Sequence, residues 1–312
     1  MRVSWTHGAV AVVLSLLVAA PAHPARAAEP GPGLVPITLT GPPPISRVVA
    51  TNGWYTPDST TTITLYSPTT GDRHPAVVFV HGGAWGRAQP TAYELRWARA
   101  LAAHEGWVVA VIGYPTKVPN EQTLEPRAIA DAIGAVSRRP DVDSRAIALW
   151  GESAGGQLAL LTAYRAAARL HPFVSGVVSI SGPTDMRTEF GSLAQRALGA
   201  VTRFEGLTPH AARAANSPRY RVTSPVDLVR TGDPATFQAI SRHDRLVPSG
   251  QVSRLARLLA AAHVPHRTVR VAGTAHSTTL ESQRPAGSRR TVQQLAVAFL
   301  GRVFAARRVN FA

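Results

Sequence analysis

The sequence predicts one doubly wound α/β domain, built on a mostly parallel sheet and carrying a small helical excursion. Three observations lead to this fold class. The 312 residues are 45% apolar and 16% charged, which supplies a large core and excludes an unfolded polar chain. Short apolar runs rich in Val and Ile alternate with longer amphipathic segments, as in chains of βα units. No internal repeat of fixed period is visible, which argues against a solenoid or propeller.

The first 27 residues have the features of a secretory signal peptide. Arg2 precedes an uncharged apolar run over residues 8–20, and Ala25-Arg26-Ala27 has the small-residue pattern of a cleavage site. The apolar run is shorter than the roughly 20 residues that a membrane-spanning helix needs. The chain also has no cysteine that could carry a lipid. We therefore expect cleavage after Ala27, secretion, and no stable membrane anchor.

Two regions make up the expected mature chain. Residues 28–50 are rich in Pro and Gly and predict an extended arm, and residues 51–312 form the α/β domain. Within the domain, Trp107–Ile112 is apolar almost throughout, as expected of a strand buried on both faces of a parallel sheet. A Gly71-Asp72 turn joins the first two strands. In chain order the predicted strands are 63–66, 76–80, 107–112, 146–150, 174–180, 236–240 and 267–271.

The predicted helices place apolar residues at helical spacing, as Tyr93, Leu95, Trp97 and Leu101 do in the first of them. One segment, residues 186–225, breaks the alternation of strands and helices. It is rich in Ala, Arg, Pro and Gly and predicts an excursion of short helices between two core strands. In chain order the predicted helices are 91–104, 124–136, 155–168, 251–262 and 291–304.

The composition excludes several classes of function. The formal net charge is +15, but the basic residues are spread along the chain, whereas a nucleic-acid binder gathers them on one face or tail. We therefore expect no nucleic-acid partner. The absence of cysteine excludes a disulfide framework, a thiolate nucleophile and Cys-based metal sites. His263 and His266 belong to a helix end and a strand start, so we expect no metal and no cofactor.

The strongest motif is Gly151-Glu152-Ser153-Ala154-Gly155, of the form G-x-S-x-G. It follows a predicted strand directly and precedes a predicted helix directly. This context is the one that a nucleophile elbow requires, because the tight turn exposes the serine hydroxyl at a helix N-terminus. The alternative is an ordinary glycine-rich turn in which Ser153 caps the helix. We expect Ser153 to be a nucleophile.

A second motif, His81-Gly82-Gly83-Ala84-Trp85, follows the predicted strand 76–80. Ester hydrolysis passes through an oxyanion that needs preplaced N–H donors, and two consecutive glycines can present bare amides to it. We expect Gly82 and Gly83 to supply such donors, with the N–H of Ala154 completing the oxyanion hole. A phosphate-binding loop is the alternative, but no G-x-x-x-x-G-K-[ST] or G-x-G-x-x-G sequence follows.

Asp244 and His276 each follow a predicted strand and complete the set. A serine hydroxyl is a weak nucleophile until an imidazole takes its proton and a carboxylate fixes the imidazole tautomer. The chain order Ser153, Asp244, His276 is the order of a Ser-Asp-His triad on parallel strands. The competitors are the carboxylates of Asp227 and Asp233, which precede the strand, and the base His243, which follows the wrong strand.

Taken together, these motifs resemble the hormone-sensitive-lipase-like and feruloyl-esterase-like branch of the α/β-hydrolase superfamily. The resemblance covers roughly residues 55–305 and is carried by HGGAW at 81–85, GESAGG at 151–156, D-R-x-V-P at 244–248 and the terminal histidine loop. It implies an α/β-hydrolase fold with cap elements over the pocket, and a carboxylic-ester hydrolase without a cofactor. Two departures are Ala84, where many relatives have a third glycine, and Ser241-Arg242-His243, where relatives often have a His-Gly pair.

The function expected from the sequence is a secreted serine carboxylic-ester hydrolase that acts on short to medium acyl esters. Trp85 and Tyr114 are the candidates for lining the acyl pocket. A feruloyl or acetyl-xylan esterase and an arylformamidase-type amidase are the alternatives within the enzyme class. A catalytically silent α/β-hydrolase that acts as a binding protein is the alternative outside it. The only expected partner is a small-molecule ester, and the sequence does not determine the oligomeric state.

Overall fold

The computed structural model describes residues 48–55, 61–69, 73–118, 120–166, 174–187, 204 and 218–309. All of them belong to one compact unit, residues 37–312. The predicted signal peptide, the arm up to residue 47, the Gly71-Asp72 turn and most of the excursion at 186–225 lie outside the described residues.

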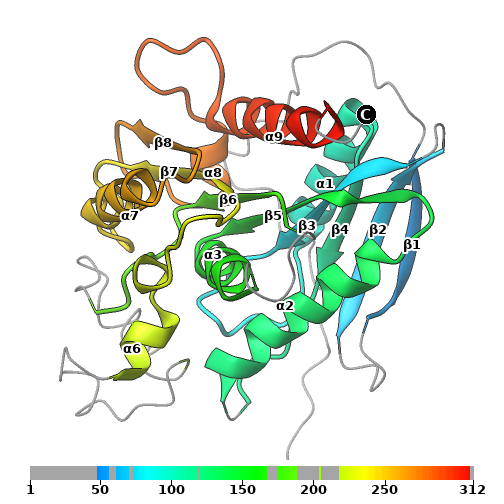
Figure 1. Cartoon of the computed structure of the whole chain (residues 1–312), viewed down its shortest axis with the longest axis horizontal. Coiled ribbons are helices and arrows are strands. Elements are labelled where there is room, and N and C mark those ends of the chain that lie inside the picture. The colour runs from blue at the N-terminus through cyan, green and yellow to red at the C-terminus, as the bar shows by residue number, and fades with distance from the viewer. Residues whose placement is uncertain are drawn as a thin grey trace, which may run out of the picture. The chain divides into compact units, whose positions relative to one another are not determined.

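A sheet of eight strands forms the centre of this unit, and it contains all seven predicted strands (Figure 1). The spatial order is β1-β2-β4-β3-β5-β6-β7-β8. β1 pairs antiparallel with β2, β2 pairs antiparallel with β4, and all other neighbours are parallel, which confirms the mostly parallel sheet. The strands are β1 (Val48–Trp54), β2 (Thr62–Pro68), β3 (His74–Val80), β4 (Val108–Ile112), β5 (Val142–Glu152), β6 (Gly176–Ile180), β7 (Ala235–Ser241) and β8 (His266–Val271).

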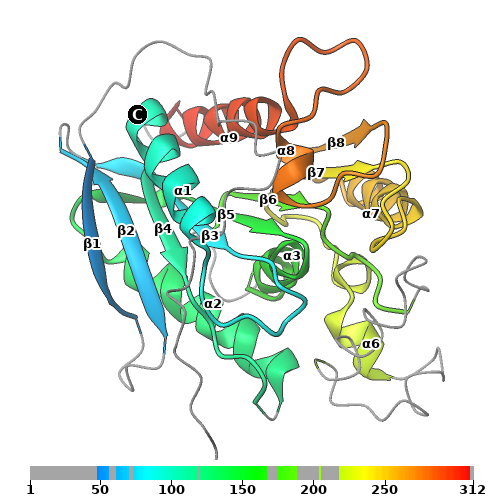
Figure 2. The same cartoon turned by 180° about the vertical axis from the view of Figure 1, so that it is seen from behind.

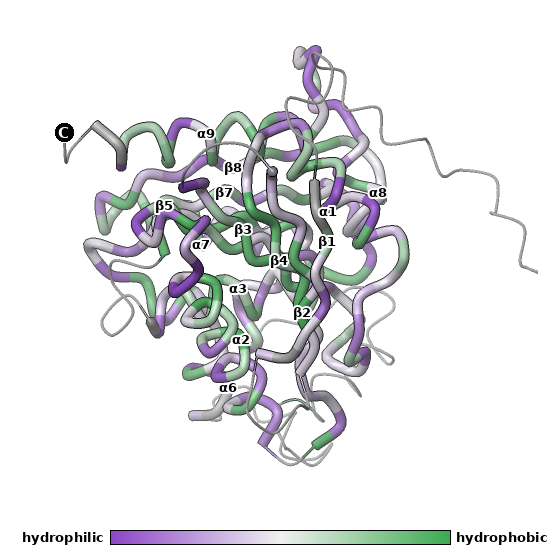
Figure 3. Tube along the Cα trace, turned by 90° about the vertical axis from the view of Figure 1, so that its right-hand side faces the viewer, coloured by the Kyte–Doolittle hydropathy of each residue, from purple (hydrophilic) through white to green (hydrophobic). Residues whose placement is uncertain are grey.

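Helices cover both faces of the sheet (Figures 1 and 2). α1 (Ala92–Glu105) and α9 (Val292–Val309) lie on one face, and α2 (Glu121–Ser137), α3 (Ala154–Ala166) and α7 (Gly250–Ala261) lie on the other. Successive residues of β3 alternate between the two cores: Val77 and Phe79 pack with α1 and α9, whereas Val78 and Val80 pack with α2, α3 and α7. Because both faces are covered, β3 and β4 are hydrophobic along their length, as the green tube in Figure 3 shows.

The chain reverses direction across the sheet between β3 and β5. From β3 it crosses outward to β4, and it then returns to β5 on the other side and continues to β8. At such a switch point the loops after two neighbouring strands diverge, and the crevice between them is where open α/β sheets bind ligands. The loops after β3 and β5 carry the two glycine motifs, so the topology places both motifs at this crevice.

Four elements are not anticipated by the sequence pattern: β1, α6 (Pro218–Thr223), the 3-10 turn η1 (Pro225–Asp227) and α8 (Thr278–Glu281). β1 begins at Val48, inside the predicted arm, and pairs with β2 from Val48 opposite Pro68 to Trp54 opposite Thr62. Its sequence contains Asn52 and Gly53, which have low strand propensity. Pairing with a partner strand therefore forms β1, and local preference does not.

Candidate active site

Ser153 occupies a one-residue link between strand and helix. β5 ends at Glu152 and α3 begins at Ala154. Ser153 has a φ of 51°, a left-handed conformation that costs a non-glycine residue free energy. Its N–H donates to Ile180 O of β6 at 2.8 Å, and its own carbonyl accepts from the N–H of Gly156 at 2.9 Å. These bonds hold the strained turn that the G-x-S-x-G motif predicts.

The glycines on either side of Ser153 are required by close backbone contacts. A Cβ on Gly151 would lie 2.1 Å from Gly155 O, and a Cβ on Gly155 would lie 2.1 Å from Val80 O. Carbonyl oxygens of the main chain cannot move aside as a flexible side chain can. The motif therefore needs glycine at both positions because β3, β5 and α3 converge there.

Three predicted side chains meet in one hydrogen-bonded series. His276 Nε2 lies 2.9 Å from Ser153 Oγ, and His276 Nδ1 lies 2.7 Å from Asp244 Oδ2. The second carboxylate oxygen of Asp244, Oδ1, accepts the backbone N–H groups of Leu246 and Val247 at 2.8 and 3.0 Å. The Asp244 side chain has no solvent exposure, whereas His276 remains 19% exposed. The carboxylate is thus fixed and buried, and the imidazole reaches solvent and the serine.

Short-range bonds shape the loop that carries His276. Thr279 Oγ1 accepts the N–H of His276 at 3.1 Å and donates to the carbonyl of the same residue at 2.7 Å. Ser241, at the end of β7, donates its hydroxyl to Ala275 O at 2.6 Å. The histidine loop is therefore tied both to its own helix α8 and to the neighbouring strand.

The competing residues have other surroundings. His243 is exposed and donates its backbone N–H to Gly273 O. Asp233 accepts the N–H of Arg230 at 2.7 Å, and Asp227 forms an ion pair with Arg187 at 3.0 Å. None of these contacts involves Ser153 or His276.

The loop after β3 passes directly beside Ser153. A Cβ on Gly82 would lie 2.9 Å from Glu152 O and 3.3 Å from Ser153 Cβ. Within the described part of the chain, the backbone N–H groups of Gly82, Gly83 and Ala154 donate to no protein acceptor. The N-terminus of α3 adds a partial positive charge at the same place. An anion next to Ser153 would find amide donors on two sides.

His81 supports this loop in its neutral form. Burial, more than any other factor, lowers the pKa of His81 to about 4. The ring stacks on Tyr114 with centroids 4.4 Å apart, and its Nδ1 lies 2.7 Å from Gly82 O. A neutral ring that carries its proton on Nδ1 donates to that carbonyl. The Tyr114 hydroxyl donates to His81 O at 2.7 Å.

Both predicted pocket residues are buried in packing contacts. Trp85 is 4% exposed, stacks on Phe204 at 5.1 Å and donates Nε1–H to Gln157 Oε1 at 3.0 Å. Tyr114 is 2% exposed and packs against His81. Phe204 belongs to the excursion between β6 and β7, so Trp85 joins the loop after β3 to that excursion. Contact of Trp85 or Tyr114 with a substrate stays a prediction.

Two buried carboxyl groups lie behind Ser153, and the sequence pattern does not indicate their pairing. Glu152 and Glu281 are each 2% exposed. Burial raises the pKa of Glu281 to about 8, and burial together with repulsion from Glu281 raises the pKa of Glu152 well above its usual value. Trp150 donates Nε1–H to Glu281 Oε1 at 2.9 Å. The pair therefore holds protons at neutral pH, directly next to the nucleophile in sequence.

Arg87 and Glu94 are further residues of this region that the motifs do not single out. They form a two-bonded ion pair beside the Gly82 carbonyl. The pattern Thr91-x-x-Glu94 before an apolar run is a capping-box signature, so a sequence signal for Glu94 existed. No local signal points to Arg87.

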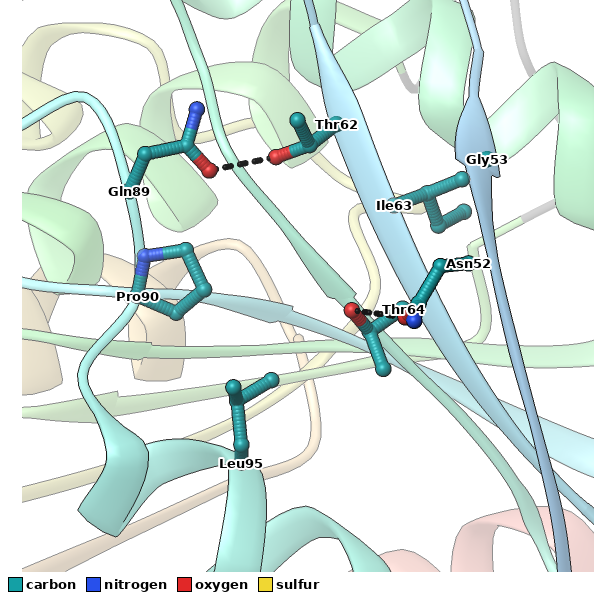
Figure 4. A pocket seen from close by; sticks show the side chains of 8 residues that line it. All are labelled: Asn52, Gly53, Thr62, Ile63, Thr64, Gln89, Pro90 and Leu95. Carbon is teal, nitrogen blue, oxygen red and sulfur yellow. Dashed lines mark hydrogen bonds between the residues drawn. The ribbon is translucent and has the colours of Figure 1, made fainter.

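A surface groove of about 490 Å³ opens at the antiparallel edge of the sheet (Figure 4). The Thr62 hydroxyl donates to Gln89 Oε1 at 2.5 Å, and the Thr64 hydroxyl donates to Asn52 Oδ1 at 2.9 Å. These bonds tie the loop before α1 to β2, and β2 to β1. The groove is lined by Asn52, Gly53, Thr62, Ile63, Thr64, Gln89, Pro90 and Leu95, none of which belongs to the set around Ser153.

Neither a metal cluster nor a membrane span is found among the described residues. No group of three or more His, Cys, Asp or Glu side chains within them could hold a metal ion. No helix in the same part of the chain is both long and apolar enough to cross a membrane.

The chain is similar to one family and to many solved structures. The BD-FAE family model matches residues 63–259. An esterase from Pyrobaculum calidifontis shares 23% identity with a TM-score of 0.62, over 87% of this chain and 88% of that one. Esterase B from Lactobacillus rhamnosis shares 19% identity with a TM-score of 0.64, over 84% and 87%. A truncated carbohydrate esterase from gut microbiota shares 18% identity with a TM-score of 0.59, over 73% and 88%. No curated protein sequence matches the chain.

Proposed function

The chain belongs to the BD-FAE family, whose fold here is that of the α/β-hydrolases, and from this premise we propose that it is a secreted serine esterase. Membership of the family makes it a hydrolase of the esterase type. The proposal adds that Ser153, His276 and Asp244 carry the reaction, that the substrates are carboxylic esters with short to medium acyl chains, and that the protein is exported.

One observation carries the mechanism: the unbroken hydrogen-bonded series from Ser153 Oγ through His276 to Asp244. In the proposed reaction, His276 Nε2 accepts the serine proton while Ser153 Oγ attacks the acyl carbon. Asp244 holds the His276 tautomer and stabilises the imidazolium that forms. The geometry meets the first requirement for a general base, which is hydrogen-bonding reach to the proton it removes.

The rest of the cycle uses the same groups. The N–H groups of Gly82, Gly83 and Ala154 donate to the oxyanion of the tetrahedral intermediate. His276 then protonates the leaving alcohol, and an acyl-enzyme on Ser153 remains. A water molecule gives its proton to His276 and attacks the acyl carbon, which releases the acid and restores the Ser153 hydroxyl.

A feruloyl or acetylated-polysaccharide ester is the second candidate substrate. The family match favours it, and one structural neighbour is named as a carbohydrate esterase. The arylformamidase-type amidase and the silent binding protein of the sequence analysis remain as outcomes of the test below.

Hydrolysis of a p-nitrophenyl ester series from acetate to palmitate tests the proposal, with methyl ferulate, acetylated xylan and an aryl formamide as additional substrates. We expect turnover that is highest on short or medium chains and lost in Ser153→Ala. A fluorophosphonate probe should label the unmodified protein and leave Ser153→Ala unlabelled. His276→Ala should lose activity, whereas His243→Ala, a matched control on the exposed competitor, should keep it.

Two results would contradict the proposal in different ways. Turnover of ferulate, xylan acetate or formamide without turnover of simple esters would replace the substrate class and keep the serine mechanism. No turnover of any substrate and no labelling would point to a binding protein. Export is tested separately, by sequencing the N-terminus of the protein recovered from the culture medium, where Ala28 is the expected first residue.

A further inference from the structure

Arg87 links the loop after β3 to the first turn of α1. Its Nε and Nη2 donate to Gly82 O at 3.2 and 3.0 Å, and its Nη1 donates to Gln89 O at 3.2 Å. The same guanidinium meets the Glu94 carboxylate through two parallel bonds of 2.8 and 2.7 Å. A planar fork on a carboxylate fixes both the position and the plane of the guanidinium. Arg87 is therefore a rigid donor to the Gly82 carbonyl.

Glu94 is itself held in place. Its Oε2 accepts the backbone N–H of Thr91 at 2.6 Å, which closes the capping box of α1, and its side chain is only 4% exposed. Burial opposes ionisation, but the hydrogen bonds from Arg87 and Thr91 lower the pKa of Glu94. The hydrogen bond to Glu94 raises the pKa of Arg87. Both partners thus stay charged.

The Gly82 carbonyl belongs to the peptide group whose N–H is on Gly83. In a planar trans peptide, the C=O and the following N–H point in opposite directions. Gly82 O accepts bonds from Arg87 and from His81 Nδ1, so the Gly83 N–H must point away from both of them. A positive charge on the carbonyl side also polarises the peptide group and makes its N–H a stronger donor.

The loop needs such a constraint because its backbone is strained. Gly83, Ala84 and Trp85 have φ values of 127°, 51° and 52°, three consecutive residues in left-handed or glycine-favoured conformations. A Cβ on Gly83 would lie 2.6 Å from Arg87 Cβ, so the loop is closely packed on Arg87 at this point. Without Arg87, the neutral His81 would be the remaining described donor to the Gly82 carbonyl.

We propose that Arg87 is a positioning residue for ester hydrolysis, which aims and polarises the Gly83 N–H through the Gly82–Gly83 peptide. The inference rests on the proposed function, since the Gly83 N–H acts on an oxyanion only if one forms at Ser153. Arg87 stabilises the transition state through this peptide and does not touch the substrate.

Arg87→Gln tests the inference on the ester that the unmodified protein hydrolyses best. Removing an oxyanion donor costs roughly 10²–10³ in rate, so weakening one predicts a fall in kcat of about 10- to 100-fold. KM should change little, because the ground-state carbonyl carries little charge. A trifluoromethyl ketone, which forms a tetrahedral oxyanion adduct on serine, should lose affinity by the same factor as kcat/KM.

A double variant separates positioning from folding. Arg87→Gln leaves the Glu94 charge buried and unpaired, which destabilises the fold. In Arg87→Gln/Glu94→Gln this charge is gone, and the glutamine that replaces Glu94 can still accept the N–H of Thr91. We expect the thermal midpoint to recover in the double variant while kcat and ketone affinity stay low. Recovery of kcat together with the midpoint would overturn the inference, because Arg87 would then be only structural.

Two further results separate this inference from the proposed function. Arg99→Gln, a matched control at an exposed position of the same helix, should retain full activity. If the unmodified protein shows Ser153-dependent hydrolysis but Arg87→Gln keeps its kcat and ketone affinity, the inference fails and the proposed function stands. If the unmodified protein hydrolyses nothing and is not labelled by fluorophosphonate, both fail.

Discussion

Asp244 illustrates how one side chain can be committed to two tasks. Its Oδ1 is occupied by two backbone N–H groups of its own loop, so the carboxylate cannot rotate, and its Oδ2 faces His276 Nδ1. A carboxylate in this position keeps the proton of His276 on Nδ1, which leaves Nε2 free to accept the proton of Ser153.

Asp244→Asn should therefore abolish most of the activity without changing the fold. Asparagine has the same size, but its amide can donate to His276 Nδ1 and so favour the tautomer whose Nε2 is already protonated. We expect kcat to fall by roughly 10³–10⁴, measured on the best ester, with a thermal midpoint close to that of the unmodified protein. Asp227→Asn is the control and should keep its activity. A kcat within tenfold of normal in Asp244→Asn would argue against this assignment.

Glu281 makes the stability of the fold depend on pH. An unfolded glutamate titrates near 4.5, whereas the folded protein holds the Glu281 proton up to about pH 8. Between these values the folded state binds more protons than the unfolded state, so the contribution of this group to stability falls as pH rises. The decrease has a limiting slope of about 1.4 kcal/mol per pH unit and ends above about pH 8.

Glu281→Gln should remove this decrease. Glutamine does not titrate, and its Oε1 can still accept the Trp150 N–H. We expect the variant to gain stability relative to the unmodified protein as pH rises from 5 to 8, measured by urea unfolding at several pH values. The exposed Asp131→Asn is the control and should leave the slope unchanged. An equal pH dependence in Glu281→Gln and the unmodified protein would contradict the buried, protonated state.

The strand–turn–helix unit of β5, Ser153 and α3 is the element on which the site depends. Its position beside β3 follows from the parallel pairing that sets Val80 opposite Gly151. In this register the end of β3 meets the first turn of α3, and the loop after β3 passes beside Ser153. One strand pairing thus brings together the nucleophile and the glycine loop.

Gly155→Ala should disrupt this unit. The added Cβ would lie 2.1 Å from Val80 O and 2.4 Å from His81 O, and neither oxygen can withdraw without moving β3. We expect a protein that is destabilised by more than about 3 kcal/mol or fails to fold, and whose remaining folded fraction is inactive.

Gly301→Ala is the matched control for that change. Gly301 lies in α9 with nothing within 4 Å of its added Cβ, so alanine should raise the free energy of unfolding by about 0.5–1 kcal/mol. Both variants are compared by urea unfolding and esterase activity. Normal stability in Gly155→Ala would mean that β3 and α3 are farther apart than the structure has them.

Strand positions were predictable from the sequence, but the ends of the sheet were not. The five parallel strands from β4 to β8 are apolar runs between turn residues, and each was placed within a few residues because apolar runs and turns are local signals. β1 carries no such signal and is formed by its antiparallel pairing with β2. α6 and α8 are too short to show a helical period.

Across the whole sheet, stability should decrease from the centre to the β1 edge. β3, β4 and β5 lie between two helical layers with nearly all their residues buried, whereas residues 50–53 of β1 are exposed and only one neighbouring strand pairs with β1. Hydrogen exchange followed by mass spectrometry should show residues 76–80 and 146–151 exchanging only through global unfolding. Residues 48–54 should exchange much faster, through local opening. Equal protection of β1 and β3 would contradict this gradient.

Local pattern determined the alternation of strands and helices, the elbow at Ser153 and the glycine loop, because turn chemistry and apolar periodicity act over a few neighbouring residues. The tertiary structure alone brought His276 to Ser153 across 123 residues and Trp150 to Glu281 across 131. It also decided that Asp244 faces His276, that Arg87 holds the Gly82 carbonyl, and that Glu152 and Glu281 are buried with raised pKa values. Desolvation and hydrogen-bond geometry depend on which distant segments pack together, and this information does not exist in any single stretch of the chain.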